Sequence, residues 1–138
     1  MQLVDKCKNQ VSYEALMKSK EFHKAVASMA SEDTLILMQN QYAVNMTFNW
    51  LCNTKDMLGV HEKVLSVSLD DEADELLAKR FPEIKRLKWV VPCLDKKFNY
   101  GDGLYQLFYL FRSNFARALV ESNVSFWMIQ QVSLFRIK

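Results

Sequence analysis

The stretch that decides the fold is residues 34–41, which read Thr-Leu-Ile-Leu-Met-Gln-Asn-Gln. Residues 35–38 are all apolar, so both faces of a strand formed here would be apolar. The polar residues that follow end this run abruptly. A short strand that is apolar on both faces is typical of a parallel sheet covered by helices on both sides. The sequence therefore predicts a buried parallel strand over residues 34–38.

The rest of the chain alternates between helical and strand patterns. Apolar residues at helical spacing predict helices over residues 12–29, 42–57, 71–78 and 104–120, and strand patterns occupy residues 63–69, 86–91 and 124–129. This order predicts an α/β fold, a three-layer Rossmann-like half with about four mainly parallel strands and flanking helices. We expect its core to contain Leu35, Leu37, Leu65, Val67, Val90, Phe108, Phe111 and Trp127.

Composition excludes several classes of protein. The chain has 138 residues and a net charge of +2, which fits one domain and predicts no nucleic-acid partner. Its only close glycine pair is Gly101 and Gly103, so it has no P-loop and no glycine-rich dinucleotide turn. The longest charge-free run, residues 34–54, is too polar for a membrane span, and the first residues lack the apolar region of a signal peptide. As written, the chain is expected in the cytosol.

The cysteines and the two glycosylation sequons carry weaker expectations. Cys7, Cys52 and Cys93 are an odd number at wide spacing, which predicts neither a disulfide framework nor a zinc site. The sequons at residues 45–47 and 123–125 have meaning only in a secreted protein. Their places within a predicted helix and beside a predicted strand favour chance occurrence.

Polar residues at the carboxyl ends of the predicted strands are the candidates for a binding site. Parallel sheets bind ligands beyond these ends, near the point where the strand order reverses. The candidates are Gln39-Asn40-Gln41 after the first strand, Asp70-Asp71 after the second, residues 92–95 after the third and Gln130-Gln131 after the fourth. The Asp70 carboxylate can accept hydrogen bonds from a ribose or a base, or it can cap the following helix. The sequence leaves both interpretations open.

Arg112 is the second informative residue, because it shares a helical stripe with Phe108, Phe115 and Leu119. An unpaired charge on such a stripe is costly to bury. Arg112 therefore either extends its head to solvent or pairs with a carboxylate or a phosphate. If the sheet is wound as predicted, Arg112 and Asp70 approach the same crevice.

Four segments of the chain resemble the nucleotide-diphospho-sugar transferase domain, in particular its nematode-type members. They are Asn49-Trp50-Leu51-Cys52, residues 68–73, residues 105–112 and residues 126–131. The resemblance covers residues 34–131, preceded by an N-terminal helical segment (1–33) and followed by a non-matching tail (132–138). It implies a GT-A-type glycosyltransferase domain that binds a nucleotide sugar, such as a UDP-sugar, and a Golgi location. Asp70 and Arg112 fall where the family places its donor pocket, and Asn40 joins them as a donor-binding candidate.

The chain departs from the family at the end of the fourth strand. There the family has an acidic motif that holds Mn²⁺ or Mg²⁺ on the donor's diphosphate, whereas this chain reads Gln130-Gln131-Val132-Ser133. Amides and a valine do not supply the anionic oxygen ligands of such an ion. We therefore expect that this chain binds no metal, that it contributes no catalytic residue and that it is inactive.

Two further expectations follow from that departure. The chain reads as a C-terminally truncated or intron-retaining product, since Val-Ser is what a consensus splice donor encodes. Its uncovered C-terminal edge, with residues 133–138 loosely held, predicts self-association. The alternative to a donor-binding transferase domain is a non-catalytic α/β fragment or a small binding module.

Overall fold

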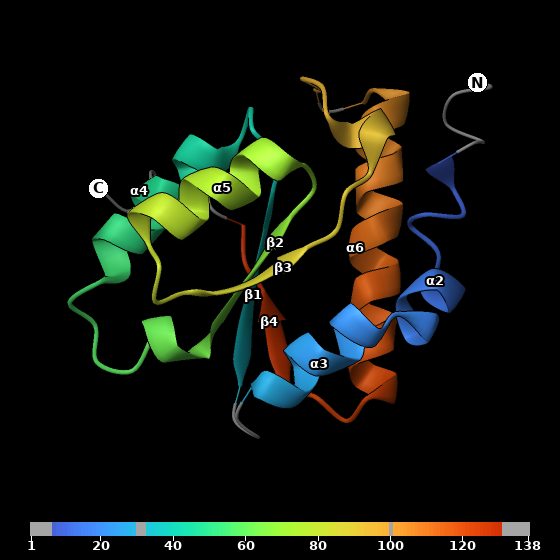
Figure 1. Ribbon diagram of the computed structural model, residues 1–138. Coiled ribbons are helices and arrows are strands. Elements are labelled where there is room, and N and C mark those ends of the chain that lie inside the picture. Colours follow the sequence, from blue (N-terminus) through green and yellow to red (C-terminus); the bar gives the residue numbers. More distant parts are fainter. Residues whose placement is uncertain (1–6, 30–32, 100, 131–138) are drawn as a thin grey trace.

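A parallel four-stranded sheet forms the centre of the molecule in the computed structural model, which describes residues 7–29, 33–99 and 101–130 (Figure 1). The strands are β1 (Thr34–Gln39), β2 (Val64–Ser68), β3 (Lys85–Lys88) and β4 (Phe126–Met128), in the spatial order β3-β2-β1-β4. All three strand pairings are parallel. The predicted α/β Rossmann-like fold is confirmed.

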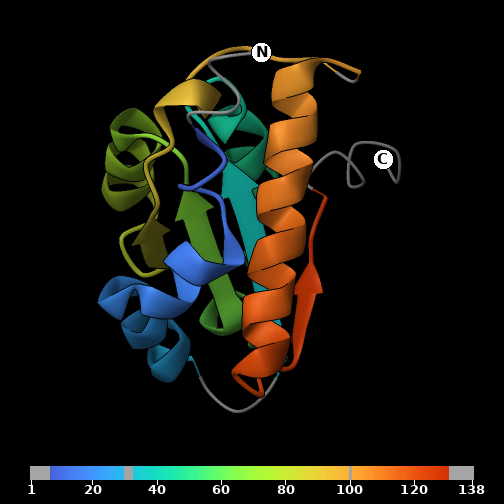
Figure 2. The same cartoon turned by 90° about the vertical axis from the view of Figure 1, so that its right-hand side faces the viewer.

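Helices cover both faces of this sheet. They are α2 (Tyr13–Lys18), α3 (Lys20–Ser28), α4 (Val44–Thr54), α5 (Asp71–Arg80) and α6 (Gly103–Glu121), with short 3₁₀ turns η1 (His61–Lys63) and η2 (Pro92–Leu94). Helices α4 and α5 lie on one face, and α6 lies on the other with α2 and α3 beside it (Figures 1 and 2). Within the described residues, no helix has the length and apolar character needed to cross a membrane.

Strand β1 packs against both helical layers, as its sequence predicts. Ile36 and Met38 belong to the apolar core shared with α6, whereas Leu37 belongs to the core shared with α4 and α5. Successive side chains of a strand point to opposite faces, so an unbroken apolar run serves two cores at once. Among the other predicted core residues, Leu65, Val67 and Phe111 are buried, and Leu35 and Phe108 are partly buried.

The prediction of a core position is wrong for two residues, Trp127 and Val90. Trp127 is 63% exposed, because β4 is an edge strand of three residues and this side chain points away from the main cores. Val90 is 42% exposed, because β3 ends at Lys88 and the chain then turns so that Val91, fully buried, enters the core instead. The hydrophobic run at residues 89–91 is therefore mostly loop rather than strand.

The helix predicted over residues 12–29 is divided in two at Ser19. This residue has extended backbone angles, so it ends α2 and begins α3. Its hydroxyl accepts a hydrogen bond from the backbone N–H of Phe22, at 3.1 Å. Serine is a preferred N-cap because its hydroxyl satisfies a backbone donor that the first helical turn leaves free. The break lets α3 change direction and pack beside β3.

A disulfide between Cys7 and Cys93 overturns the prediction from cysteine spacing. The two residues are 86 positions apart, and their Cα atoms are 6.3 Å apart, within the range of protein disulfides. Cys7 is part of the segment before α2, and Cys93 lies in η2. The bond therefore fastens the N-terminal segment to the loop that follows β3. Sequence spacing missed it because the pairing depends on how this segment packs against the fold.

Alkylation before and after reduction tests this disulfide. In the oxidised protein, iodoacetamide should modify only Cys52, which is exposed and free. After denaturation and reduction, all three cysteines should react, as read by intact mass. Cys93→Ala should lower the free energy of unfolding by about 2–4 kcal/mol, because the disulfide restricts the unfolded chain. Full alkylation of the unreduced, folded protein would contradict the pairing.

Candidate functional site

A pocket of about 320 Å³ lies at the point where the strand order reverses, between β1 and β4. The chain adds β2 and β3 on one side of β1 and returns to add β4 on the other side. Connections diverge from such a point, which leaves a crevice beyond the carboxyl ends of the two strands. Asn40 after β1 and Gln130 after β4 both line the pocket. The position is the one that the predicted topology indicates.

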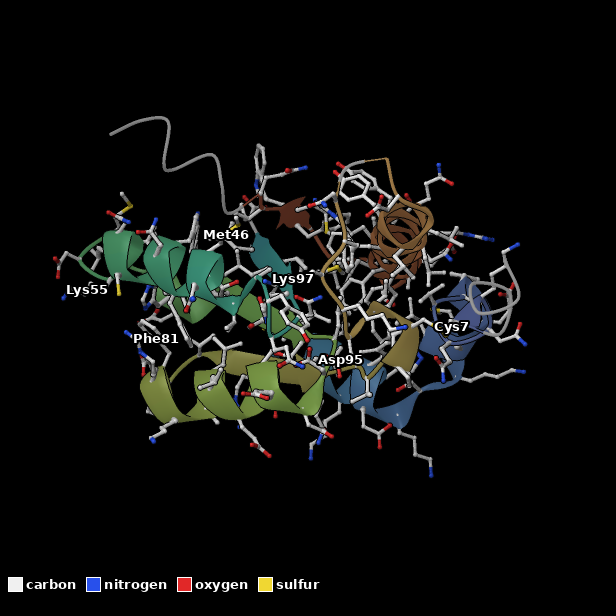
Figure 3. The ribbon with its side chains drawn as sticks, turned by 90° about the horizontal axis from the view of Figure 1, so that it is seen from above. Cys7, Met46, Lys55, Phe81, Asp95 and Lys97 are labelled. Carbon is white, nitrogen blue, oxygen red and sulfur yellow. A yellow bond between two sulfur atoms is a disulfide. The ribbon has the colours of Figure 1, made fainter. Side chains whose placement is uncertain are left out.

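Side chains from two strands, two helices and the segment after η2 line the pocket. Its apolar floor comes from β1 and β4, including Ile36 and Met128. Helix α4 contributes Met46, and Phe98 comes from the segment after η2. Figure 3 looks down on this end of the sheet and labels Met46 of α4 and Lys97 of the segment after η2. The segment thus borders one side of the pocket, and α6 borders the other.

Asn40 is buried, and its side-chain amide holds this border in place. Its Nδ2 donates to the carbonyl oxygens of Leu94 and Lys96, at 2.8 and 3.0 Å. Its Oδ1 accepts from the backbone N–H groups of Tyr42 and Ala43, at 3.0 and 3.1 Å. Both donors and the acceptor are therefore engaged within the protein. The structure gives Asn40 a positioning role at the pocket.

Gln39, the last residue of β1 and one of the strand-end candidates, forms a buried polar network whose partners the sequence did not predict. Its Nε2 lies 2.8 Å from Ser66 Oγ and 3.0 Å from Ser68 Oγ, both on β2. Its Oε1 accepts from Thr47 Oγ1 on α4, at 2.9 Å. A usable signal was present, because two serines at alternate positions in an otherwise apolar strand place hydroxyls on one face. The network fixes α4 against the carboxyl ends of β1 and β2.

Arg112 lies on the α6 side of the pocket and is half-buried. Its guanidinium carbon is 6.0 Å from the centre of the Phe108 ring and 5.5 Å from that of Tyr109. Cations are attracted to aromatic faces at these distances. Of the residues that line the pocket in the described part of the chain, Arg112 alone carries a charge.

Tyr109 connects this arginine to the end of β4. Gln130 Nε2 donates to the Tyr109 hydroxyl oxygen, at 3.3 Å. Hydrogen bonds from Tyr105 and Gln130 lower the pKa of Tyr109, with a smaller contribution from the nearby charge of Arg112. Tyr109 and Gln130 therefore link α6 to the end of β4 beside Arg112.

Asp70 lies outside this pocket, one strand further along the sheet. Its carboxylate oxygens accept from the backbone N–H groups of Gln41 and Ala73, both at 2.8 Å. The second bond makes Asp70 the N-cap of α5, so the helix-capping interpretation holds. Asp70 lines a separate surface hollow together with Asp95, which accepts a hydrogen bond from Gln41 Nε2. The position of Asp95 at this end of the sheet is visible in Figure 3.

The structure does not bring Asp70 and Arg112 together. Asp70 is engaged with backbone donors at β2, whereas Arg112 faces the pocket between β1 and β4. The expectation of one shared crevice is therefore wrong, because β1 and the turn after it separate the two side chains. Asn40 and Arg112 do line the same pocket. Gln131, the remaining strand-end candidate, lies outside the described residues.

Clustered metal ligands are absent from the part of the chain that the structure describes. Within that part of the chain, no three histidine, cysteine, aspartate or glutamate side chains lie close enough to hold one. The side chain at the end of β4 is the amide of Gln130, which contacts Tyr109. Mn²⁺ and Mg²⁺ take carboxylate and phosphate oxygens by preference.

The carboxyl of Asp70 should titrate above its ordinary pKa of 3.8. Burial raises its pKa most, the two backbone N–H donors oppose this, and the hydrogen bond and charge of Asp95 raise it further. The folded chain thus binds this proton more tightly than the unfolded chain. The contribution of Asp70 to stability should fall as the pH rises from about 3.8 through the raised pKa.

Carboxyl titration by NMR measures this directly. Asp95→Asn should lower the pKa of Asp70, and Asp70→Asn should remove this part of the pH dependence of unfolding. A pKa of Asp70 that is unchanged in the Asp95→Asn variant would show that the two carboxyls do not interact.

Asn40→Ala should destabilise the protein by about 1–3 kcal/mol, because it leaves the buried carbonyl of Leu94 and the partly buried carbonyl of Lys96 without their donors. Asn40→Asp keeps an acceptor for the α4 turn but loses both donors, so it should also destabilise. The matched control is Asn53→Ala, which removes an amide that bonds only within α4 and should change stability by less than about 1 kcal/mol. Urea denaturation of the three variants gives the comparison, and equal losses for Asn40→Ala and Asn53→Ala would exclude the positioning role.

A family model described as nucleotide-diphospho-sugar transferase matches residues 59–131, more than half of the chain. The matched residues begin in the turn before η1, continue past β4 and include Asp70 and Arg112. This match confirms the resemblance seen in the sequence. No curated protein and no solved structure matches the chain.

Proposed function

Because the chain belongs to the nucleotide-diphospho-sugar transferase family, we propose that the pocket between β1 and β4 binds a nucleotide-diphospho-sugar. The family membership makes this a glycosyltransferase-like domain. The proposed ligand is a UDP-sugar, with its diphosphate on Arg112 and its nucleoside between β1 and the aromatic side chains.

The observation that carries the proposal is the state of Arg112. It is the one charged residue lining the pocket, and no carboxylate lies within ion-pair distance of it in the described part of the chain. The guanidinium lies near the rings of Phe108 and Tyr109, which carry no charge and so do not neutralise it. A half-buried guanidinium of this kind suits a diphosphate, whose oxygens accept two parallel hydrogen bonds from the planar fork.

The remaining walls suit a nucleoside. Phe98 packs against Phe108 with ring centres 5.7 Å apart, and against Tyr105 at 6.4 Å. Aromatic side chains with exposed edges or faces stack on nucleobases. The apolar floor of the pocket excludes water from such a contact. A volume of about 320 Å³ is at the lower end of small-ligand pockets, so it accommodates the nucleoside part of the proposed donor.

The proposal assigns binding to this chain's own residues and routes no step through a metal ion. Gln130, where the family resemblance implies an acidic motif, is an amide bonded to Tyr109. We therefore propose donor binding, and we assign no residue to sugar transfer. A GT-A-type organisation of the domain is part of the same proposal.

A location in the secretory pathway, of which the Golgi is a part, completes the proposal. Disulfides form and persist in oxidising compartments and are rare in the cytosol. The Cys7–Cys93 disulfide therefore supports passage through such a compartment.

Calorimetry with UDP and UDP-sugars tests the assignment of Arg112. Arg112→Ala should weaken UDP binding by about 10- to 100-fold, because hydrogen bonds to a charged group contribute roughly 1.5–3 kcal/mol. Arg112→Lys should recover only part of the affinity, since an ammonium lacks the planar fork. The matched control is Arg117→Ala, on the same helix, whose guanidinium lies 3.9 Å from the Tyr13 ring and not in the pocket. It should bind UDP like the wild-type chain.

The same titrations in Mn²⁺ and in EDTA distinguish binding of the diphosphate by Arg112 from binding through a metal ion. Equal affinity in both buffers is expected. Binding that requires Mn²⁺, or an Arg112→Ala variant that binds UDP normally, would contradict the proposal. Absence of any nucleotide binding would leave the interpretation as a non-catalytic α/β module.

A further inference from the structure

We propose that Asn123 is an N-glycosylation site that accepts one glycan when the chain passes through the oxidising compartment of the secretory pathway. The sequence Asn123-Val124-Ser125 is an acceptor sequon. Sequence position alone favoured chance occurrence. The structure changes this assessment through the conformation of the turn and through the disulfide, and neither depends on the proposed nucleotide-sugar pocket.

The first observation is the geometry of the turn between α6 and β4. Asn123 has a φ of 58°, the left-handed conformation that asparagine tolerates better than most residues. Its backbone N–H donates to the carbonyl oxygen of Val120, at 3.0 Å, and that of Val124 donates to Leu119, at 3.0 Å. The backbone of the turn is thus tied to the end of α6. Within the described residues, the Asn123 carboxamide makes no hydrogen bond, and the residue is exposed.

The second observation concerns the hydroxyl that completes the sequon. Ser125 is exposed, and its Oγ donates to the carboxylate of Asp33, which is also exposed. The sequon therefore forms a surface turn in which both the acceptor amide and the serine are open to solvent. Sequons that are modified in secreted proteins lie in surface loops of this kind.

The third observation is the Cys7–Cys93 disulfide, which points to an oxidising compartment independently of the sequon. Disulfide formation and transfer of a glycan to asparagine both belong to secreted and extracellular proteins. The two features therefore predict the same route for this chain.

A glycan on Asn123 leaves the pocket accessible. The turn after α6 lies at the lower end of the molecule in Figures 1 and 2, whereas the pocket opens at the opposite, carboxyl end of the strands. Helix α6 has 19 residues and spans about 28 Å between these ends.

The other sequon, Asn45-Met46-Thr47, has a different environment. Thr47 is fully buried, and its hydroxyl donates to Gln39. Asn45 is exposed but adjoins Met46, which lines the pocket, so a glycan there would stand at the pocket mouth. We therefore assign the site to Asn123 alone.

The chemical step is a glycosyl transfer from a lipid-linked oligosaccharide diphosphate, carried out by the cell's own transferase. A bond forms between Asn123 Nδ2 and C1 of the first sugar, while the bond between C1 and the diphosphate oxygen breaks. The amide loses one proton, and the lipid diphosphate leaves.

The test is expression of the whole chain in insect cells behind a cleavable secretory leader, with a tag that carries one known acceptor sequon. The tag reports entry into the compartment. Peptide N-glycosidase should lower the apparent mass of the wild-type chain by the mass of two glycans, one from the tag and one from Asn123. Mass spectrometry should then find residue 123 converted from asparagine to aspartate.

Variants of the sequons provide the controls. Asn123→Gln and Ser125→Ala should each lose one glycan. Ser125→Thr should keep both glycans because it retains the hydroxyl, and Asn45→Gln should also keep both. A chain whose tag is modified while Asn123 is not, or a glycan that is lost only in Asn45→Gln, would overturn the proposal.

Discussion

The buried amide of Gln39 is the interaction on which the arrangement of the site depends. It joins three elements at one point, because it bonds to Ser66 and Ser68 of β2 and accepts from Thr47 of α4. A buried amide without partners costs several kilocalories per mole, so α4 and the two strands are restricted to positions in which this side chain is satisfied. Apolar packing alone tolerates a wider range of helix positions than a hydrogen-bonded network does.

The residues that follow Gln39 extend this constraint into the pocket. Asn40 begins the turn into α4 and at the same time binds the carbonyls of Leu94 and Lys96. The segment after η2 is therefore held against the end of β1 by one side chain. The Cys7–Cys93 disulfide restrains the same segment from the other side, through η2. This one side of the pocket is thus fixed by a buried amide and a covalent bond, although the segment that forms it belongs to no helix or strand.

The two charged candidates separate into different roles for the same reason. Asp70 comes shortly after β2. Its two carboxylate oxygens accept hydrogen bonds from the backbone N–H groups of Gln41 and of Ala73 at the start of α5. Arg112 lies in the middle of α6, where the facing side chains are aromatic and no carboxylate is in reach among the described residues. Asp70 holds the start of α5 and the turn after β1 through backbone hydrogen bonds, and Arg112 keeps its charge available at the pocket.

The sequence by itself determined the α/β class, the alternation of elements and the family, because the apolar run of β1 and the helical periods are local patterns. It also placed Asn40 at a strand end that borders the pocket, since parallel strands end at one edge. Tertiary structure alone decided that Asp70 and Arg112 lie in different pockets and that Cys7 meets Cys93. It also decided that Val90 and Trp127 face solvent. These outcomes depend on where edge strands stop and on which loops pack together, and such long-range contacts leave no periodic signal along the chain.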